Sequence, residues 1–160
     1  MDYPTHPYED VFRLAYHGLR PGLVLVVVDG EIDVYTGPYL RNLLTEVLHE
    51  HAHVIVDMSR VDFFDSTGLG ILVGGLKRAR GRGGSLVLVI ADAADPSQRE
   101  RQDKTRKYLR ITGMSKVFPV YGDRMDAVRR YAEVDGRLTY AGEPDENWEE
   151  VSGRPTPSPS

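Results

Sequence analysis

The hydroxyl group of one serine, Ser66, has the position that best fits a reversible covalent modification. Ser66 lies in the run Asp65-Ser66-Thr67-Gly68-Leu69-Gly70, after an apolar stretch at 54–56 and a turn-like stretch at 59–62. Apolar positions then recur at steps of three and four, at Leu69, Leu72, Leu76 and Ala79. This change of period predicts a strand, a tight turn and a helix that begins at Ser66.

The first turn of such a helix suits a phosphorylated side chain. Its backbone N–H groups have no acceptor within the helix, and the helix dipole favours negative charge there. Ser66 could therefore carry a phosphoryl group without unfolding its own helix. Asp65 and Ser66 are also common N-cap residues, so capping alone is the alternative interpretation. Thr67, the nearest rival hydroxyl, is expected to cap or support the turn.

The two sides of this helix differ in what they offer to a partner. Opposite the core positions lie Thr67, Gly70, Ile71, Gly74, Lys77 and Arg78. Glycine inside a helix costs about 0.8–1.0 kcal/mol relative to alanine, so Gly70 and Gly74 indicate close approach by another backbone. We expect Ile71 to be an exposed apolar anchor on this docking surface. A phosphate here would add roughly −1.5 to −2 charge and repel a partner that covers Ser66.

Patterns typical of enzymes are missing or incomplete. The run around Ser66 differs from the Asp-Thr-Gly of aspartic proteases by an inserted residue, and it has no second copy. Gly-x-Ser-x-Gly, the signature of a nucleophile elbow, is absent. The chain also has no cysteine, which excludes disulfides and thiolate chemistry. No nucleophile–base pair or metal-ligand set emerges, so we expect neither enzymatic activity nor a cofactor.

Two further groups of residues allow more than one interpretation. Asp57 ends an apolar run, as the phosphoacceptor of a response-regulator receiver does, but the other receiver signals are missing. We therefore expect a structural role for Asp57. His49, His51 and His53 alternate where a helix gives way to a strand, and metal binding is the alternative to ordinary histidines near a helix end.

Composition narrows the class of protein. A chain of 160 residues with 41% hydrophobic content suits one globular domain. The net charge is −4, yet residues 13–134 carry 18 basic against 15 acidic side chains, too mild a balance for a nucleic-acid interface. The longest apolar run, at 23–28, is too short to cross a membrane, so we expect a cytoplasmic protein without membrane or nucleic-acid partners.

Alternating strand and helix patterns predict the fold. We expect strands at 12–16, 23–28, 54–58, 86–90 and 117–121, the last irregular or at an edge because of Pro119. Helices are expected from an N-cap at Thr36 to about residue 50, from 66 to 81, shortly before 111, and after Asp123 with Met125, Val128 and Tyr131. This alternation indicates a single α/β domain at 11–134 whose sheet is largely parallel beyond its first hairpin.

Four motifs in order resemble one known family. They are Gly30-Glu31-Ile32-Asp33, the apolar run at 54–57, the run from Asp65 to Gly70, and Thr112-Gly113-Met114 leading to Val117-Phe118-Pro119-Val120. Together they resemble a STAS domain of the bacterial anti-sigma factor antagonist type, the SpoIIAA-like family, over roughly residues 11–134. The resemblance implies a mixed, mostly parallel sheet with helices packed mainly on one side.

The resemblance also implies a partner-switching role in transcription, of the kind used in stress or developmental signalling. Unphosphorylated members bind an anti-sigma factor that is also a Ser/Thr kinase, which frees the sigma factor. The kinase phosphorylates the serine that matches Ser66, and a PP2C-type phosphatase reverses this step. ATP is then used by the kinase, and this chain needs no cofactor. Besides the docking surface, Asp33 and Asp65 are candidate partner contacts, with a solvated turn as the alternative for Asp33 and Glu31.

Two segments depart from the family pattern. The charged stretch at 91–103 is longer than usual and is expected to be an inserted loop. Residues 135–160 are acidic, end in Pro and Ser, and are expected to be a disordered tail, while 1–10 form an N-terminal extension. A ligand- or lipid-sensing STAS module without sigma-factor control is the alternative function, and a polar pocket in the structure would favour it.

Overall fold

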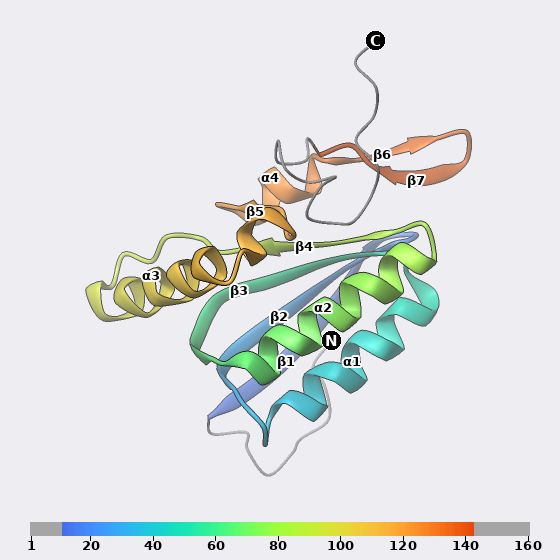
Figure 1. Cartoon of the computed structure of the whole chain (residues 1–160). Coiled ribbons are helices and arrows are strands. Elements are labelled where there is room, and N and C mark those ends of the chain that lie inside the picture. The colour runs from blue at the N-terminus through green and yellow to red at the C-terminus, as the bar shows by residue number, and fades with distance from the viewer. Residues whose placement is uncertain (1–10, 143–160) are drawn as a thin grey trace.

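A five-stranded sheet forms the centre of the computed structural model, which describes residues 11–142 (Figure 1). The strand order is β1-β2-β3-β4-β5. β1 (Phe12–Arg20) and β2 (Leu23–Ile32) pair antiparallel, and β3 (His53–Phe64), β4 (Ser85–Val89) and β5 (Val120–Tyr121) are added in parallel. The predicted fold class, an α/β domain with a mostly parallel sheet beyond its first hairpin, is confirmed. β5 is shorter than expected and lies at the sheet edge, as its proline indicated.

The three central strands are apolar on both faces, because both faces of the sheet are covered. Alternate side chains of β2, β3 and β4 enter two separate cores. Val24, Val56 and Leu88 belong to the larger core, whereas Leu25 and Ile55 belong to the smaller one. The continuous apolar runs in the sequence thus follow from burial on both sides, which is typical of parallel sheets.

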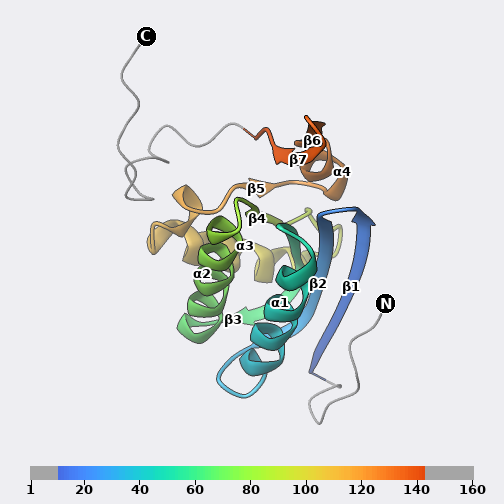
Figure 2. The same ribbon diagram turned by 90° about the vertical axis from the view of Figure 1, so that its right-hand side faces the viewer.

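Two parallel layers, the sheet and a pair of helices, enclose the larger core (Figure 2). α1 (Gly37–Glu50) and α2 (Ser66–Gly81) lie side by side on this face. The predicted core positions of α2 are buried or half-buried against it. Gly75 permits this packing, because a β-carbon there would lie 3.0 Å from Leu86 Cδ1 and 3.2 Å from Leu44 Cδ1.

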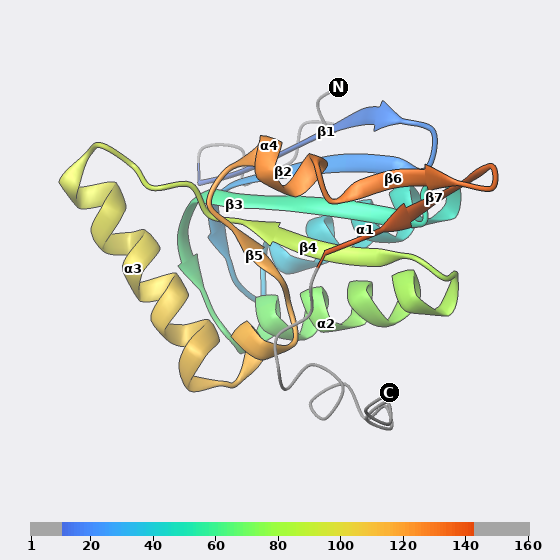
Figure 3. The ribbon, with the colours of Figure 1, turned by 90° about the horizontal axis from the view of Figure 1, so that it is seen from above.

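The opposite face of the sheet is covered by the C-terminal elements, as seen from above in Figure 3. α4 (Arg124–Val128) is followed by an antiparallel hairpin of β6 (Tyr131–Val134) and β7 (Arg137–Tyr140). Asp135 and Gly136 form the turn with φ of 51° and 77°, the left-handed geometry that Asp-Gly favours in tight hairpins.

Two sequence predictions about this region are therefore wrong. The tail predicted to be disordered from residue 135 contains β7, and the last helix ends at Val128 instead of reaching Tyr131. Apolar side chains of the hairpin pack on the sheet, which supplies the burial that a lone hairpin lacks. The predicted N-terminal extension at 1–10 and the rest of the tail lie outside the described residues.

The charged stretch at 91–103 is also different from its prediction. Its second half forms the start of α3 (Pro96–Ile111), which η1 (Met114–Lys116) follows. The side chain of Asp95 caps α3 by accepting a hydrogen bond from the backbone N–H of Gln98. The buried residues of α3 are Gln102, Thr105 and Leu109, so only one of the three is apolar. The helix predicted shortly before residue 111 therefore begins at Pro96, and hydrophobic periodicity could not reveal its first half because its contact face is largely polar.

Buried polar contacts hold α3 to the sheet. The Gln102 side chain is 1% exposed. Its amide nitrogen donates to the carbonyl oxygens of Ser59 at 2.7 Å and Ala91 at 2.6 Å, and its oxygen accepts from Ala93 N at 2.9 Å. Polar atoms that are buried but fully paired stabilise and orient a contact without an apolar stripe.

Candidate functional site

Ser66 is the first residue of α2, directly after the C-terminal end of β3, as the sequence predicted. Its side chain is exposed. Within residues 11–142 its hydroxyl takes part in no hydrogen bond. The hydroxyl is thus open to a modifying enzyme and is not required to hold the turn together.

Asp65 provides the cap of α2. One oxygen of its carboxylate accepts hydrogen bonds from Thr67 N at 2.9 Å and Gly68 N at 3.2 Å. The cap is therefore Asp65. Thr67, which was expected to cap or support the turn, takes part in it through its backbone amide. These two N–H groups at the helix start already donate to Asp65. The helix dipole would therefore stabilise a phosphate on Ser66, but these two groups would not donate hydrogen bonds to it.

A shallow groove runs between the start of α1 and the outer side of α2. Its volume is about 490 Å³, and it is lined by Val34, Pro38, Arg41, Ser66, Thr67, Gly70, Ile71, Gly74 and Arg78. Besides Ser66, five of these belong to the surface predicted from α2 alone. The groove thus brings Ser66 together with the two glycines of that surface and places Arg78 beside them.

Ile71 differs from its prediction. It is 8% exposed and packs in the larger core, so it is not the exposed anchor that the helix pattern indicated. The reason is the neighbouring helix: a β-carbon at Gly37 would lie 2.7 Å from Ile71 Cδ1 and 3.3 Å from Thr67 Cγ2. Close approach of α1 buries a flank of α2 that the sheet alone would leave open.

The exposed apolar side chain of the groove comes from another segment, the loop between β2 and α1. Val34 is 62% exposed there. Sequence reasoning missed Val34, Pro38 and Arg41, because a groove between two helices depends on which helices are neighbours. The sequence offered one signal, a valine directly after the Gly-Glu-Ile-Asp motif in a turn-like segment.

Gly70 and Gly74 have no role in packing among the described residues. A β-carbon at either position would have no atom within 4 Å outside its own helix turn. Both positions therefore carry the helix-propensity cost of glycine without an internal reason for it. The groove floor is smooth where these residues lie, which leaves room for another backbone.

The remaining predicted contacts lie around this groove without lining it. Asp33 uses one carboxylate oxygen within its own turn, where it accepts from Tyr35 N at 2.8 Å and Thr36 N at 3.0 Å. Lys77 is exposed on α2. Asp33 thus shapes the loop that carries Val34, and its contact with a partner stays a prediction, as do those of Asp65 and Lys77.

Asp57 and His53 are engaged in structural contacts on the other face of the sheet. Asp57 is 6% exposed, and one of its oxygens accepts from Arg124 Nε at 2.6 Å. His53 uses both ring nitrogens, toward Ser85 Oγ and the Leu138 carbonyl, each at 2.9 Å. Burial lowers the pKa of His53, which keeps the imidazole neutral. Among the residues described, no three His, Asp or Glu side chains gather as a metal site.

Comparison with known proteins agrees with the fold described above. The model of the STAS domain matches residues 19–127. The anti-sigma F factor antagonist of Paenibacillus polymyxa is 26% identical over 109 residues, which cover 67% of this chain and 85% of that protein. The described part of the chain contains no helix of the length and apolarity needed to span a membrane.

Solved structures show the same arrangement of elements. An anti-sigma factor antagonist from Mycobacterium paratuberculosis aligns with a TM-score of 0.61 and 28% identity, covering 79% of this chain and 97% of that one. The anti-sigma factor antagonist SpoIIAA in its unphosphorylated form aligns with a TM-score of 0.56 and 20% identity, covering 75% and 95%. The second likeness is one of fold.

Proposed function

Because the chain belongs to the STAS domain family, we propose that it is an anti-sigma factor antagonist controlled by phosphorylation of Ser66. In its unphosphorylated form it binds an anti-sigma factor that is also a Ser/Thr kinase, and a PP2C-type phosphatase restores that form. The observation that carries this proposal is an exposed hydroxyl, without a hydrogen-bond partner in the described part of the chain, at the edge of a groove with a smooth glycine floor.

The groove offers a partner both charge and shape. Arg41 and Arg78 line it from α1 and α2, and both are exposed. Its positive side chains favour an acidic partner segment, while Val34 offers apolar contact and Gly70 and Gly74 permit a close backbone. This combination supports the groove as the docking surface, with Val34 in the role first assigned to Ile71.

Phosphorylation of Ser66 cancels most of the positive charge that this surface offers. It adds roughly −1.5 to −2 charge next to the carboxylate of Asp65, so the groove edge becomes anionic. The helix dipole stabilises the phosphate by only about 0.3–1 kcal/mol, which is sufficient for the free protein to stay folded. In a closed complex, a like-charge contact costs several kcal/mol, and each 1.4 kcal/mol lowers affinity about tenfold. Phosphorylation therefore releases the partner and leaves the fold intact.

The test begins with capture of the partner. The Ser66→Ala form is used to isolate bound proteins from lysate, and ATPase-fold kinases among them are purified. Calorimetry then measures their affinity for wild type, Ser66→Ala, Ser66→Asp and Ser66→Glu. We expect Ser66→Ala to bind as wild type and the two acidic variants to bind at least about tenfold more weakly.

A matched control separates the groove from general charge. Ser115 is an exposed serine in η1 and is not among the residues that line the groove. Ser115→Asp adds the same charge and is expected to leave affinity unchanged. Peptide mapping after incubation with kinase and ATP should place one phosphoryl group on Ser66. Equal affinity of all Ser66 variants would contradict the switch.

A further inference from the structure

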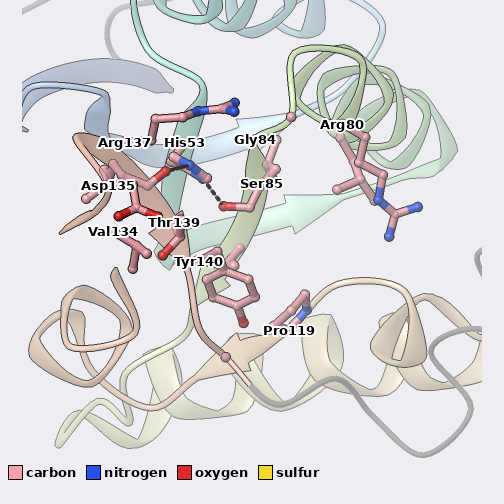
Figure 4. A pocket seen from close by; sticks show the side chains of 16 residues that line it. His53, Arg80, Gly84, Ser85, Pro119, Val134, Asp135, Arg137, Thr139 and Tyr140 are labelled. Carbon is pink, nitrogen blue, oxygen red and sulfur yellow. Dashed lines mark hydrogen bonds between the residues drawn. The ribbon is translucent and has the colours of Figure 1, made fainter. Parts of the chain in front are cut away.

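A second hollow lies at the other end of α2, about 20 Å along the helix from Ser66 at 1.5 Å per residue. Its volume is about 660 Å³, within the usual range for small-molecule sites. The N-terminal ends of β3 and β4, the turn after α2, and β7 enclose it (Figure 4). The family match ends at residue 127, so the wall formed by the hairpin lies beyond the matched region.

Hydrogen bonds fix the hairpin wall to the strand ends. The Leu138 carbonyl can only accept, so His53 Nε2 donates to it, and Nδ1 of the neutral ring accepts from Ser85 Oγ. Ser85 Oγ in turn lies 2.9 Å from the Tyr131 hydroxyl, which donates to it. Every polar atom of this chain of bonds is paired, so the wall is preformed before any ligand enters.

The lining combines apolar walls with charged side chains at its rim. Leu76, Leu86, Val87, Val134 and Leu138 supply apolar surface. Among the described residues that line it, the charged side chains are Arg80, Arg137 and Asp135. Within residues 11–142 the guanidinium of Arg137 has no ion pair. It reaches across to the turn after α2, where Nη2 would lie 3.7 Å from a β-carbon at Gly83.

We propose that this hollow binds a small amphipathic anion, a molecule with an apolar body and one carboxylate, sulfonate or phosphate group. The apolar body lies against the leucine and valine walls, and Arg137 pairs with the anionic group across the mouth. Guanidinium is suited to this role because its fork of N–H donors matches the oxygens of such anions. The site is separate from the Ser66 groove and does not depend on the proposed partner switch.

Fluorescent probes test the proposal on the full-length chain. Anilinonaphthalene sulfonate is an amphipathic anion, and phenylnaphthylamine is its uncharged counterpart. We expect saturable binding of one sulfonate probe per chain and about tenfold weaker binding of the neutral probe. Amide NMR spectra should show shifts in β7 and at the starts of β3 and β4, with none around Ser66.

Two arginine variants identify the charged contact. Arg137→Gln keeps the length and polarity of the side chain and should weaken the sulfonate probe about tenfold while the neutral probe is unaffected. Arg78→Gln, on α2 and in the Ser66 groove, is the matched control and should bind the probe as wild type. Thermal unfolding of each variant verifies that the fold is retained. Equal binding of both probes, equal loss in both variants, or shifts around Ser66 would overturn the proposal.

Discussion

Replacement of Gly70 and Gly74 by alanine should make the free protein more stable and its complex weaker. A β-carbon at either position meets open space, so alanine adds helix propensity without a clash. Each substitution should raise the free energy of unfolding by about 0.8–1.0 kcal/mol. For a domain of this size, each kcal/mol raises the melting temperature by about 2–4 °C.

The same two methyl groups would hold a partner's backbone away from the groove floor. We therefore expect the double alanine variant to bind the captured kinase at least about tenfold more weakly, although it is the more stable protein. Thermal unfolding measures the first effect and calorimetry the second. Opposite signs in the two measurements distinguish a docking surface from a helix that merely tolerates glycine.

Two other glycines of α2 provide controls. A β-carbon at Gly81 also meets open space, so Gly81→Ala should raise or preserve stability without lowering affinity. At Gly75 it would lie 3.0 Å from Leu86 Cδ1, so Gly75→Ala should be destabilising. The reasoning is wrong if the alanines at 70 and 74 lower the melting temperature, or if kinase affinity is unchanged by them.

Three further substitutions test buried polar contacts outside the Ser66 groove. Arg124→Met removes the partner of the buried Asp57 carboxylate and should lower the free energy of unfolding in urea by about 1–3 kcal/mol, whereas exposed Arg129→Met should have little effect. Gln102→Leu removes the side-chain partner of the Ala91 carbonyl and the Ala93 amide, leaves the Ser59 carbonyl with the longer bond from Gln98 Nε2, and should cost at least about 2 kcal/mol in the same assay. The lowered pKa of His53 in the folded protein means that its imidazole binds a proton more readily in the unfolded chain than in the folded one. Stability should therefore fall as pH drops below about 6.5, and urea titrations should show a weaker fall for His53→Gln.

Ser66 and its helix could be predicted because the information is local. The change from an apolar run to steps of three and four, with Asp65 at the boundary, is contained in a short stretch of chain. The structure confirms α2 from Ser66 to Gly81 and the apolar side it turns to the sheet. The central strands were predicted for the same reason, although β2 and β3 continue further than their apolar runs.

Local signals also existed for the C-terminal hairpin and for the start of α3, which the prediction missed. Asp135-Gly136 is a strong hairpin signal, and Asp95-Pro96 is a typical helix start. The acidic composition after residue 134 led to a prediction of disorder there, and the high charge at 91–103 led to a prediction of a loop. In both segments the apolar pattern is weak, since α3 buries Gln102 and Thr105, and the hairpin rests on a sheet face already formed by other strands.

The sequence by itself determined the order of elements, the family resemblance and the position of the phosphoacceptor candidate, because capping and side-chain period depend on neighbours along the chain. Only the tertiary structure decided that Ile71 is buried, that Val34 and Arg41 share a groove with Ser66, and that β7 closes a second hollow over His53. These contacts join residues up to 85 positions apart. They depend on which surfaces remain uncovered once the layers pack, and no stretch of sequence encodes that alone.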